Sequence, residues 1–149
     1  GMKDLGIMKG NIDEAVKAGA HALFMPHGLG HMLGLDVHDM EGLGENFVGY
    51  NEKVKRSEQF GTAFLRFALE CRPGHVFTIE PGCYFIPQLI DQWKAEKKFA
   101  EYINYDEADK FRDFGGVRIE DNIVITENGH RLLGRPIPKK VAEIEALCS

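Results

Sequence analysis

The chain has 149 residues, a common length for one domain with a buried core. Hydrophobic residues make up 44% of it and charged residues 28%, with acids and bases mixed and a formal net charge of −5. No basic block marks a nucleic-acid surface, and no apolar run approaches the ~20 residues that cross a bilayer. Nucleic acid and membrane are therefore excluded as expected partners.

The cysteines Cys71, Cys83 and Cys148 are odd in number and show no C-x-x-C spacing. This pattern indicates reduced thiols and a cytoplasmic location, with a single catalytic cysteine as the less favoured alternative. Gly1 before Met2 is typical of tag removal, so we expect one domain over residues 2–149.

The first predicted helix follows Asn11, whose side chain can cap it, and ends near Phe24 because of Pro26. A glycine-rich structured loop is expected from there to about Gly49. Alternating residues over 62–69 predict a strand, with a short helix as the alternative.

The second half of the chain alternates predicted strands and helices, without a repeat or a linker. A strand over 76–79 ends at Glu80, and Pro87 opens a second helix. The most strand-like stretch is 117–126, followed by a turn at 127–129. A last helix from about Lys139 is expected to bury Val141, Ile144 and Leu147.

Three histidines, His27, His31 and His38, lie close together in the glycine-rich loop. Glycines between the first two make a helical zinc motif improbable and favour a tight loop in which imidazoles approach a ligand closely. The alternative is a set of polar side chains with ordinary hydrogen-bond partners.

Two glutamates lie at the end of a predicted strand or within one. Glu80 ends one predicted strand, where burying a carboxylate is costly unless it is paired or binds a metal. Glu120 shares a predicted strand face with Arg118. An exposed strand-end acid and a plain ion pair are the respective alternatives. One histidine and two carboxylates suit divalent metals such as manganese, zinc, cobalt or iron.

Three segments resemble those of the prolidases (Xaa-Pro dipeptidases) in the pita-bread metallopeptidase family. They cover 24–31 with 33–39, 77–82 and 114–121, in the order of that family, and the likeness extends over nearly the whole chain from about Gly10. The resemblance implies an α+β fold that is a partial pita-bread domain, its carboxy-terminal half, with an antiparallel sheet and helices packed on one face.

The resemblance also implies a metal site. It makes His31, Glu80 and Glu120 metal ligands, with Glu120 bridging two ions in the parent enzymes. Manganese is the expected metal, with zinc or cobalt as alternatives. Glu80 also matches the residue that shuttles the proton, which requires a carboxylate within hydrogen-bond reach of the hydrolytic water.

Four further residues match substrate-binding positions of that family. His27 and His38 match histidines that contact the substrate and the reacting centre, and His38 is thereby also a catalytic candidate. Arg66 matches the arginine that binds the free carboxylate of an Xaa-Pro dipeptide, a role that suits the guanidinium fork. Arg118 is expected to orient the substrate.

The match lacks one part of the family's site, the two aspartates of an upstream strand hairpin. We therefore expect the 149 residues alone to bind at most one metal weakly and to be inactive or weakly active as a dipeptidase. We also expect a homodimer, in which a second copy occupies the place of the family's other half. The alternatives are a non-catalytic peptide- or protein-binding module and one half of a split enzyme.

Overall fold

A computed structural model describes residues 1–149 and divides into two compact units, which are described one at a time. The first unit contains Gly1–Gly28, Ser57–Phe64 and Gly82–Arg118. The second contains Leu29–Arg56, Leu65–Pro81 and Ile119–Ser149. None of the helices combines the length and the apolar character needed to span a membrane.

The first helix of the first unit, α1 (Ile12–Ala18), begins as predicted at Asn11, whose side chain accepts hydrogen bonds from two backbone N–H groups. It is shorter than predicted. Gly19 adopts a left-handed φ of 94° and caps the helix, and a separate 3₁₀ helix, η1 (Ala20–Leu23), follows. The helical spacing of apolar residues therefore continued past a glycine that ends the α-helix.

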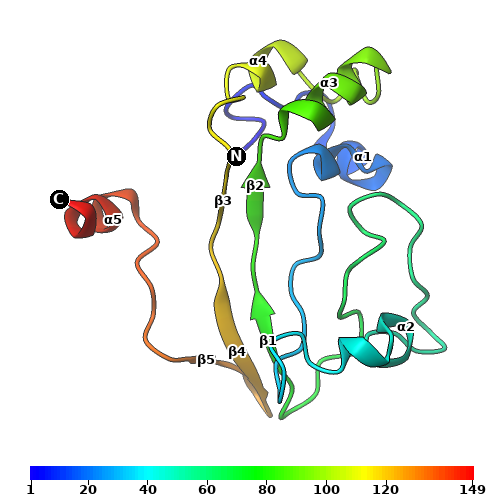
Figure 1. The fold of residues 1–149 in the computed structure, drawn as a ribbon, viewed down its shortest axis with the longest axis vertical. Helices are drawn as coiled ribbons and strands as arrows, with labels where there is room; N and C mark the ends of the chain where they lie inside the picture. The colour runs from blue at the N-terminus through cyan, green and yellow to red at the C-terminus, as the bar shows by residue number, and fades with distance from the viewer. The chain divides into compact units, whose positions relative to one another are not determined.

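The rest of the first unit comprises two helices and a small sheet. Helix α3 (Pro87–Ala95) begins at its proline as predicted, whereas the short helix α4 (Tyr105–Asp109) gave no periodic signal. Strand β2 (Gly82–Tyr84) pairs antiparallel with β3 (Gly116–Arg118). In Figure 1, α3 and α4 lie next to each other beyond the ends of these two strands.

All residues of the apolar core cluster belong to the first unit. Its fully buried side chains include Ile7, Leu23, Ile90 and Ile103. Aromatic rings extend the packing, as in the pair Phe85 and Phe111 with ring centroids 4.9 Å apart. The helices of this unit are thus held together mainly by buried apolar area.

The second unit is built on a three-stranded antiparallel sheet in the order β1-β4-β5. The strands are β1 (Val76–Ile79), β4 (Asp121–Thr126) and β5 (Gly129–Leu133), and Figure 1 shows β1 and β4 side by side. The predicted turn at 127–129 is confirmed, because Thr126 pairs with Gly129 across the hairpin. The remaining edge of β1 is covered by the loop at 29–33, through backbone hydrogen bonds.

Short helices interrupt the glycine-rich loop, namely η2 (Glu41–Leu43) and α2 (Glu45–Val48). The predicted strand at 62–69 is wrong, since this segment forms only an isolated bridge between Gly30 and Arg66. The strand is interrupted at Arg66, which adopts a left-handed φ of 63° that an extended strand does not tolerate.

Two further predictions need correction. The stretch 117–126 is not one strand, because Ile119 and Glu120 separate β3 from β4. The last helix, α5 (Val141–Cys148), is present, but its apolar residues Val141, Ile144 and Leu147 are exposed rather than buried. Helical spacing predicts which residues share a face, but not whether another element covers that face.

Candidate metal centre

The two candidate glutamates lie at interruptions of the sheet strands. Glu80 follows β1 directly, and Glu120 directly precedes β4. Between these interruptions, the backbone N–H of Ile119 donates to the carbonyl oxygen of Pro81 at 3.2 Å. A residue in an interruption is free of the strict alternation of a strand, so its side chain can turn toward a site that a regular strand would not present.

His31 approaches from the loop that covers β1. Its Nδ1 lies 3.0 Å from the carbonyl oxygen of Met32, which can only accept, so Nδ1 carries the proton. The lone pair is therefore on Nε2, which lies 3.3 Å from Oε1 of Glu80. This is the tautomer that a metal-binding histidine requires at Nε2.

The ligand atoms of His31, Glu80 and Glu120 all lie within 4.8 Å of one another. His31 is 3% exposed and Glu80 is 8% exposed, whereas Glu120 is exposed to solvent. Two ligands of one tetrahedral ion, each about 2.1 Å from it, are separated by about 3.4 Å. The 3.3 Å separation of Nε2 and Oε1 fits that requirement. The structure thus brings the three predicted ligands together in a group that suits a divalent cation.

His38 and Arg66 lie beside this group. The rings of His31 and His38 meet edge to face, with centroids 4.3 Å apart. Nη1 of Arg66 donates to Nε2 of His38 at 2.9 Å, since a guanidinium has only donors. Two of the four residues predicted to bind substrate therefore contact each other, and one of them, His38, contacts the candidate ligand His31.

Arg66 is held in its unusual backbone conformation by a carboxylate. Its N–H donates to Oε1 of Glu45 at 2.6 Å, and Oε2 of the same residue lies 3.2 Å from Nη2 of Arg56. Nε of Arg66 is also 3.8 Å from Oε1 of Glu41. Sequence reasoning missed both glutamates, because neither belongs to a recognisable motif and their distance from Arg66 along the chain gives no signal.

His27 and Arg118, the other two predicted substrate residues, belong to the first unit. Nδ1 of His27 donates to the carbonyl oxygen of Gly28 at 2.7 Å, so its Nε2 accepts from the hydroxyl of Tyr84 at 3.0 Å. Arg118 is the last residue of β3, where it is exposed and pairs with Gly82. The tautomer of His27 is thereby fixed within its own unit.

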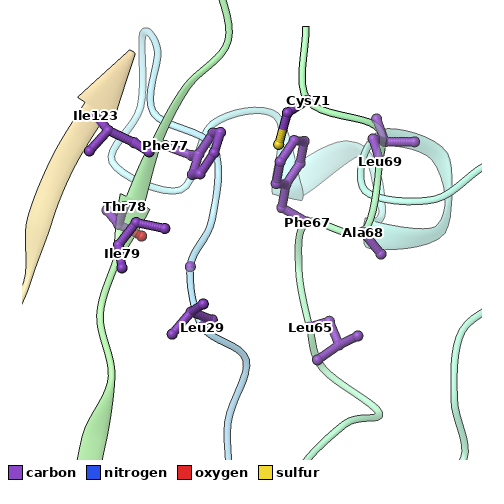
Figure 2. Close-up of a pocket in the computed structure, with 11 residues that line it drawn as sticks. Leu29, Leu65, Phe67, Ala68, Leu69, Cys71, Phe77, Thr78, Ile79 and Ile123 are labelled. Carbon is purple, nitrogen blue, oxygen red and sulfur yellow. The ribbon is translucent and has the colours of Figure 1, made fainter. Parts of the chain in front are cut away.

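An apolar cavity of about 500 Å³ lies in the second unit, between β1 and the segment that contains Arg66. Figure 2 shows the Phe67 and Phe77 rings next to each other in its lining, and their centroids are 4.9 Å apart. None of His31, Glu80 and Glu120 lines this cavity. The cavity therefore lies beside the candidate metal group, since Thr78 and Ile79 line it, but it includes none of the three candidate ligands.

Known proteins resemble this chain over most of its length. Residues 2–127 match the family model described as Metallopeptidase family M24. The chain is 46% identical to Xaa-Pro dipeptidase of Homo sapiens over 95% of its own length, which is 27% of that protein. It is 40% identical to Xaa-Pro dipeptidase of Stenotrophomonas maltophilia over 91% of its length and 30% of the relative.

Among solved structures, zinc-substituted aminopeptidase P of E. coli in complex with product gives a TM-score of 0.60 at 37% identity, over 98% of this chain and 25% of that one. Proline aminopeptidase P II of Yersinia pestis gives a TM-score of 0.61 at 32% identity, again over 98% of this chain and 25% of that one. The predicted fold, part of a pita-bread domain with helices and an antiparallel sheet, is confirmed. The chain spans about a quarter of the length of these relatives, and it belongs to metallopeptidase family M24.

Proposed function

We propose that this chain forms the carboxy-terminal half of the catalytic domain of a metal-dependent Xaa-Pro dipeptidase. The observation that carries the proposal is the convergence of His31, Glu80 and Glu120, whose ligand atoms lie within 4.8 Å of one another. Such a set suits manganese, zinc or cobalt. The names of the curated relatives, Xaa-Pro dipeptidases from two organisms, support this substrate class.

The three residues would hold the ion in distinct ways. His31 offers Nε2 in the required tautomer, and Glu80 offers a buried carboxylate whose charge a cation would offset. Glu120 reaches the same point from solvent. A divalent cation bound there supplies Lewis-acid polarisation of a carbonyl and lowers the pKa of bound water. Glu80 would also accept a proton from water held nearby, a role that suits a carboxylate.

Substrate binding is assigned to the residues around this group. The guanidinium of Arg66 suits bidentate capture of the free carboxylate of a dipeptide. Its hydrogen bond to His38 orients that imidazole beside His31, so both side chains would meet a substrate at the metal. We assign His27 and Arg118 to the same function through their motif positions in the family.

The 149 residues alone are expected to bind one ion weakly and to hydrolyse Gly-Pro slowly or not at all. They supply one imidazole and two carboxylates, whereas a site for two metals needs further carboxylates. We assign the chain a cytoplasmic location and manganese as its metal. Rapid manganese-dependent hydrolysis of Gly-Pro by the purified chain would contradict the low peptidase activity expected here.

A titration with Mn²⁺ tests the site itself. Binding should be lost in Glu80→Gln and weakened in Glu120→Gln, because each substitution removes an anionic ligand. Glu127→Gln, in the exposed turn after β4, is the matched control and should bind like the unaltered chain. Equal binding by all four proteins, or none by the unaltered chain, would exclude the proposed metal site.

We also propose that two copies associate. Exposed apolar side chains in the second unit, among them Phe47 in α2 and Leu147 in α5, support this, because large exposed apolar residues mark surfaces that become covered. Light scattering at micromolar concentration should report a dimer. A single monomeric species at that concentration would contradict the proposal.

A further inference from the structure

The hydroxyl of Thr78, a fully buried residue of β1, connects two of the candidate ligands. Its Oγ1 lies 3.0 Å from the backbone nitrogen of His31 and 2.8 Å from Oε1 of Glu80. One side chain therefore contacts the backbone of one ligand and the carboxylate of another. This residue lies in the 77–82 segment of the sequence analysis, which predicted no role for it.

The chemistry of the groups fixes the direction of both hydrogen bonds. The backbone N–H of His31 can only donate, so the hydroxyl oxygen accepts from it. The hydroxyl proton then remains for Glu80, whose ionised carboxylate can only accept. A hydrogen bond to a carboxylate in a buried setting is among the stronger ones in proteins. The result is a directed chain from amide to hydroxyl to carboxylate.

The backbone around Thr78 shows that this arrangement replaces a regular sheet contact. Its N–H donates to the carbonyl oxygen of His31 at 3.0 Å, as in an antiparallel pair, but the N–H of His31 turns to the hydroxyl instead of the Thr78 carbonyl. Gly30 takes up the space beside that carbonyl, since a Cβ there would lie 1.8 Å from the Thr78 oxygen. The loop is thus pressed against β1 where the hydroxyl is inserted.

We propose that Thr78 is a positioning residue for the metal centre. It fixes the backbone of His31 and the carboxylate of Glu80 relative to each other, so that Nε2 and Oε1 face one point before any ion arrives. The inference rests on the proposed metal site and goes beyond it, because Thr78 itself binds no ion. Outer groups of this kind change metal affinity about 10–100-fold when they are removed.

Binding of Mn²⁺ alone to the 149-residue chain tests the inference, with free Mn²⁺ followed by electron paramagnetic resonance. Thr78→Val keeps the shape of the side chain and removes the hydroxyl, and its affinity should fall by about 10–100-fold. Thr78→Ser keeps the hydroxyl and should restore most of the affinity. Thr126→Val makes the same chemical change at an exposed position of β4 and should leave the affinity unchanged.

The outcomes separate the inference from the proposed function. No binding of Mn²⁺ by the unaltered chain contradicts the proposed metal site, and the inference with it. Binding by the unaltered chain that Thr78→Val leaves unchanged contradicts the inference alone. Affinity lost equally in Thr78→Ser and Thr78→Val also overturns it, because the hydroxyl would then not be the group that matters.

A second measurement needs no substitution, in case Thr78→Val does not fold. In the unaltered chain without metal, the hydroxyl proton of Thr78 should exchange slowly with water and show a nuclear Overhauser effect to the side chain of Glu80. A hydroxyl proton bonded to a buried carboxylate is shielded from solvent in this way. Rapid exchange of that proton would contradict the directed chain of hydrogen bonds.

Discussion

The two compact units differ in what they mainly bury, although the second also buries Tyr50 and Phe77. The apolar core cluster lies wholly in the first unit, around residues such as Leu23, Ile90 and Trp93. In the second unit, the buried hydroxyl of Thr78 accepts from the backbone N–H of His31 and donates to the carboxylate of Glu80, so three buried polar residues are linked by hydrogen bonds. Apolar burial is the larger source of stability, whereas a buried polar group mainly fixes geometry. The first unit should therefore determine stability, and the second should determine binding.

The largest effect is expected from a cavity in the first unit. Ile90→Ala removes a fully buried side chain from α3 and should lower the free energy of unfolding by about 2–5 kcal/mol, as measured with urea. Leu35→Ala in the second unit removes a fully exposed side chain and should change it by less than about 0.5 kcal/mol. Equal losses in the two variants would break the contrast between the units.

The next effect concerns the carboxylate that holds Arg66. Glu45→Ala removes the acceptor of the Arg66 N–H and should lower the free energy of unfolding by about 1–3 kcal/mol. Glu45→Gln keeps an acceptor oxygen and should cost less. Urea unfolding of both variants measures the difference, and a larger loss in Glu45→Gln than in Glu45→Ala would contradict this assignment.

A smaller effect depends on the metal. Mn²⁺ at ten times its dissociation constant should raise the free energy of unfolding by about 1.4 kcal/mol, because it binds only the folded chain. EDTA should remove this increment, and Glu80→Gln should never show it. Thermal unfolding with Mn²⁺ and with EDTA measures the increment. An equal increment in Glu80→Gln would mean that the cation stabilises the chain elsewhere.

The smallest effect is a pH dependence in the first unit. The hydrogen bond from Lys94 lowers the pKa of Asp109, opposed by partial burial and supported by Arg112. Since the folded pKa lies below the unfolded one, the carboxylate stabilises the fold at neutral pH. That contribution decreases once the pH falls below about 3.9, the pKa of Asp109 in the unfolded chain. It is lost as the pH falls through the lower pKa of the folded chain.

Asp109→Asn tests this dependence, because it removes the titrating group and keeps the size of the side chain. The stability difference between Asp109→Asn and the unaltered chain should shrink as the pH falls through this range. Urea unfolding at a series of pH values measures it. A difference that stays constant with pH would show that the ion pairs of this unit are not its cause.

Much of this arrangement could be predicted from local sequence. Asn11 predicted the start of α1, Pro87 predicted the start of α3, and the glycine turn predicted the β4–β5 hairpin, because each acts through its own backbone. The left-handed conformation of Arg66 could not be predicted in this way, since it depends on Glu45, a distant residue in the sequence.

The candidate site also combines features that local sequence predicts with features that depend on distant residues. The resemblance to the prolidases predicted His31, Glu80 and Glu120 as metal ligands, and the structure brings these three side chains together. The role of Thr78 has only a weak local signal: it lies two residues before Glu80, and such residues share a strand face. Its contact with the His31 backbone depends on the loop that covers β1, which no local pattern fixes.

The two strand interruptions also determine where this chain can change in length. The segment from α3 to α4 connects β2 to β3 beyond the ends of both strands, so insertions at its exposed positions, which spare core residues such as Ile90, should leave both carboxylates in place. One residue added between Ile79 and Glu80 would shift the carboxylate away from His31 and Thr78. Members of the family should therefore vary in size along the helical segment and keep a constant spacing at the interruptions.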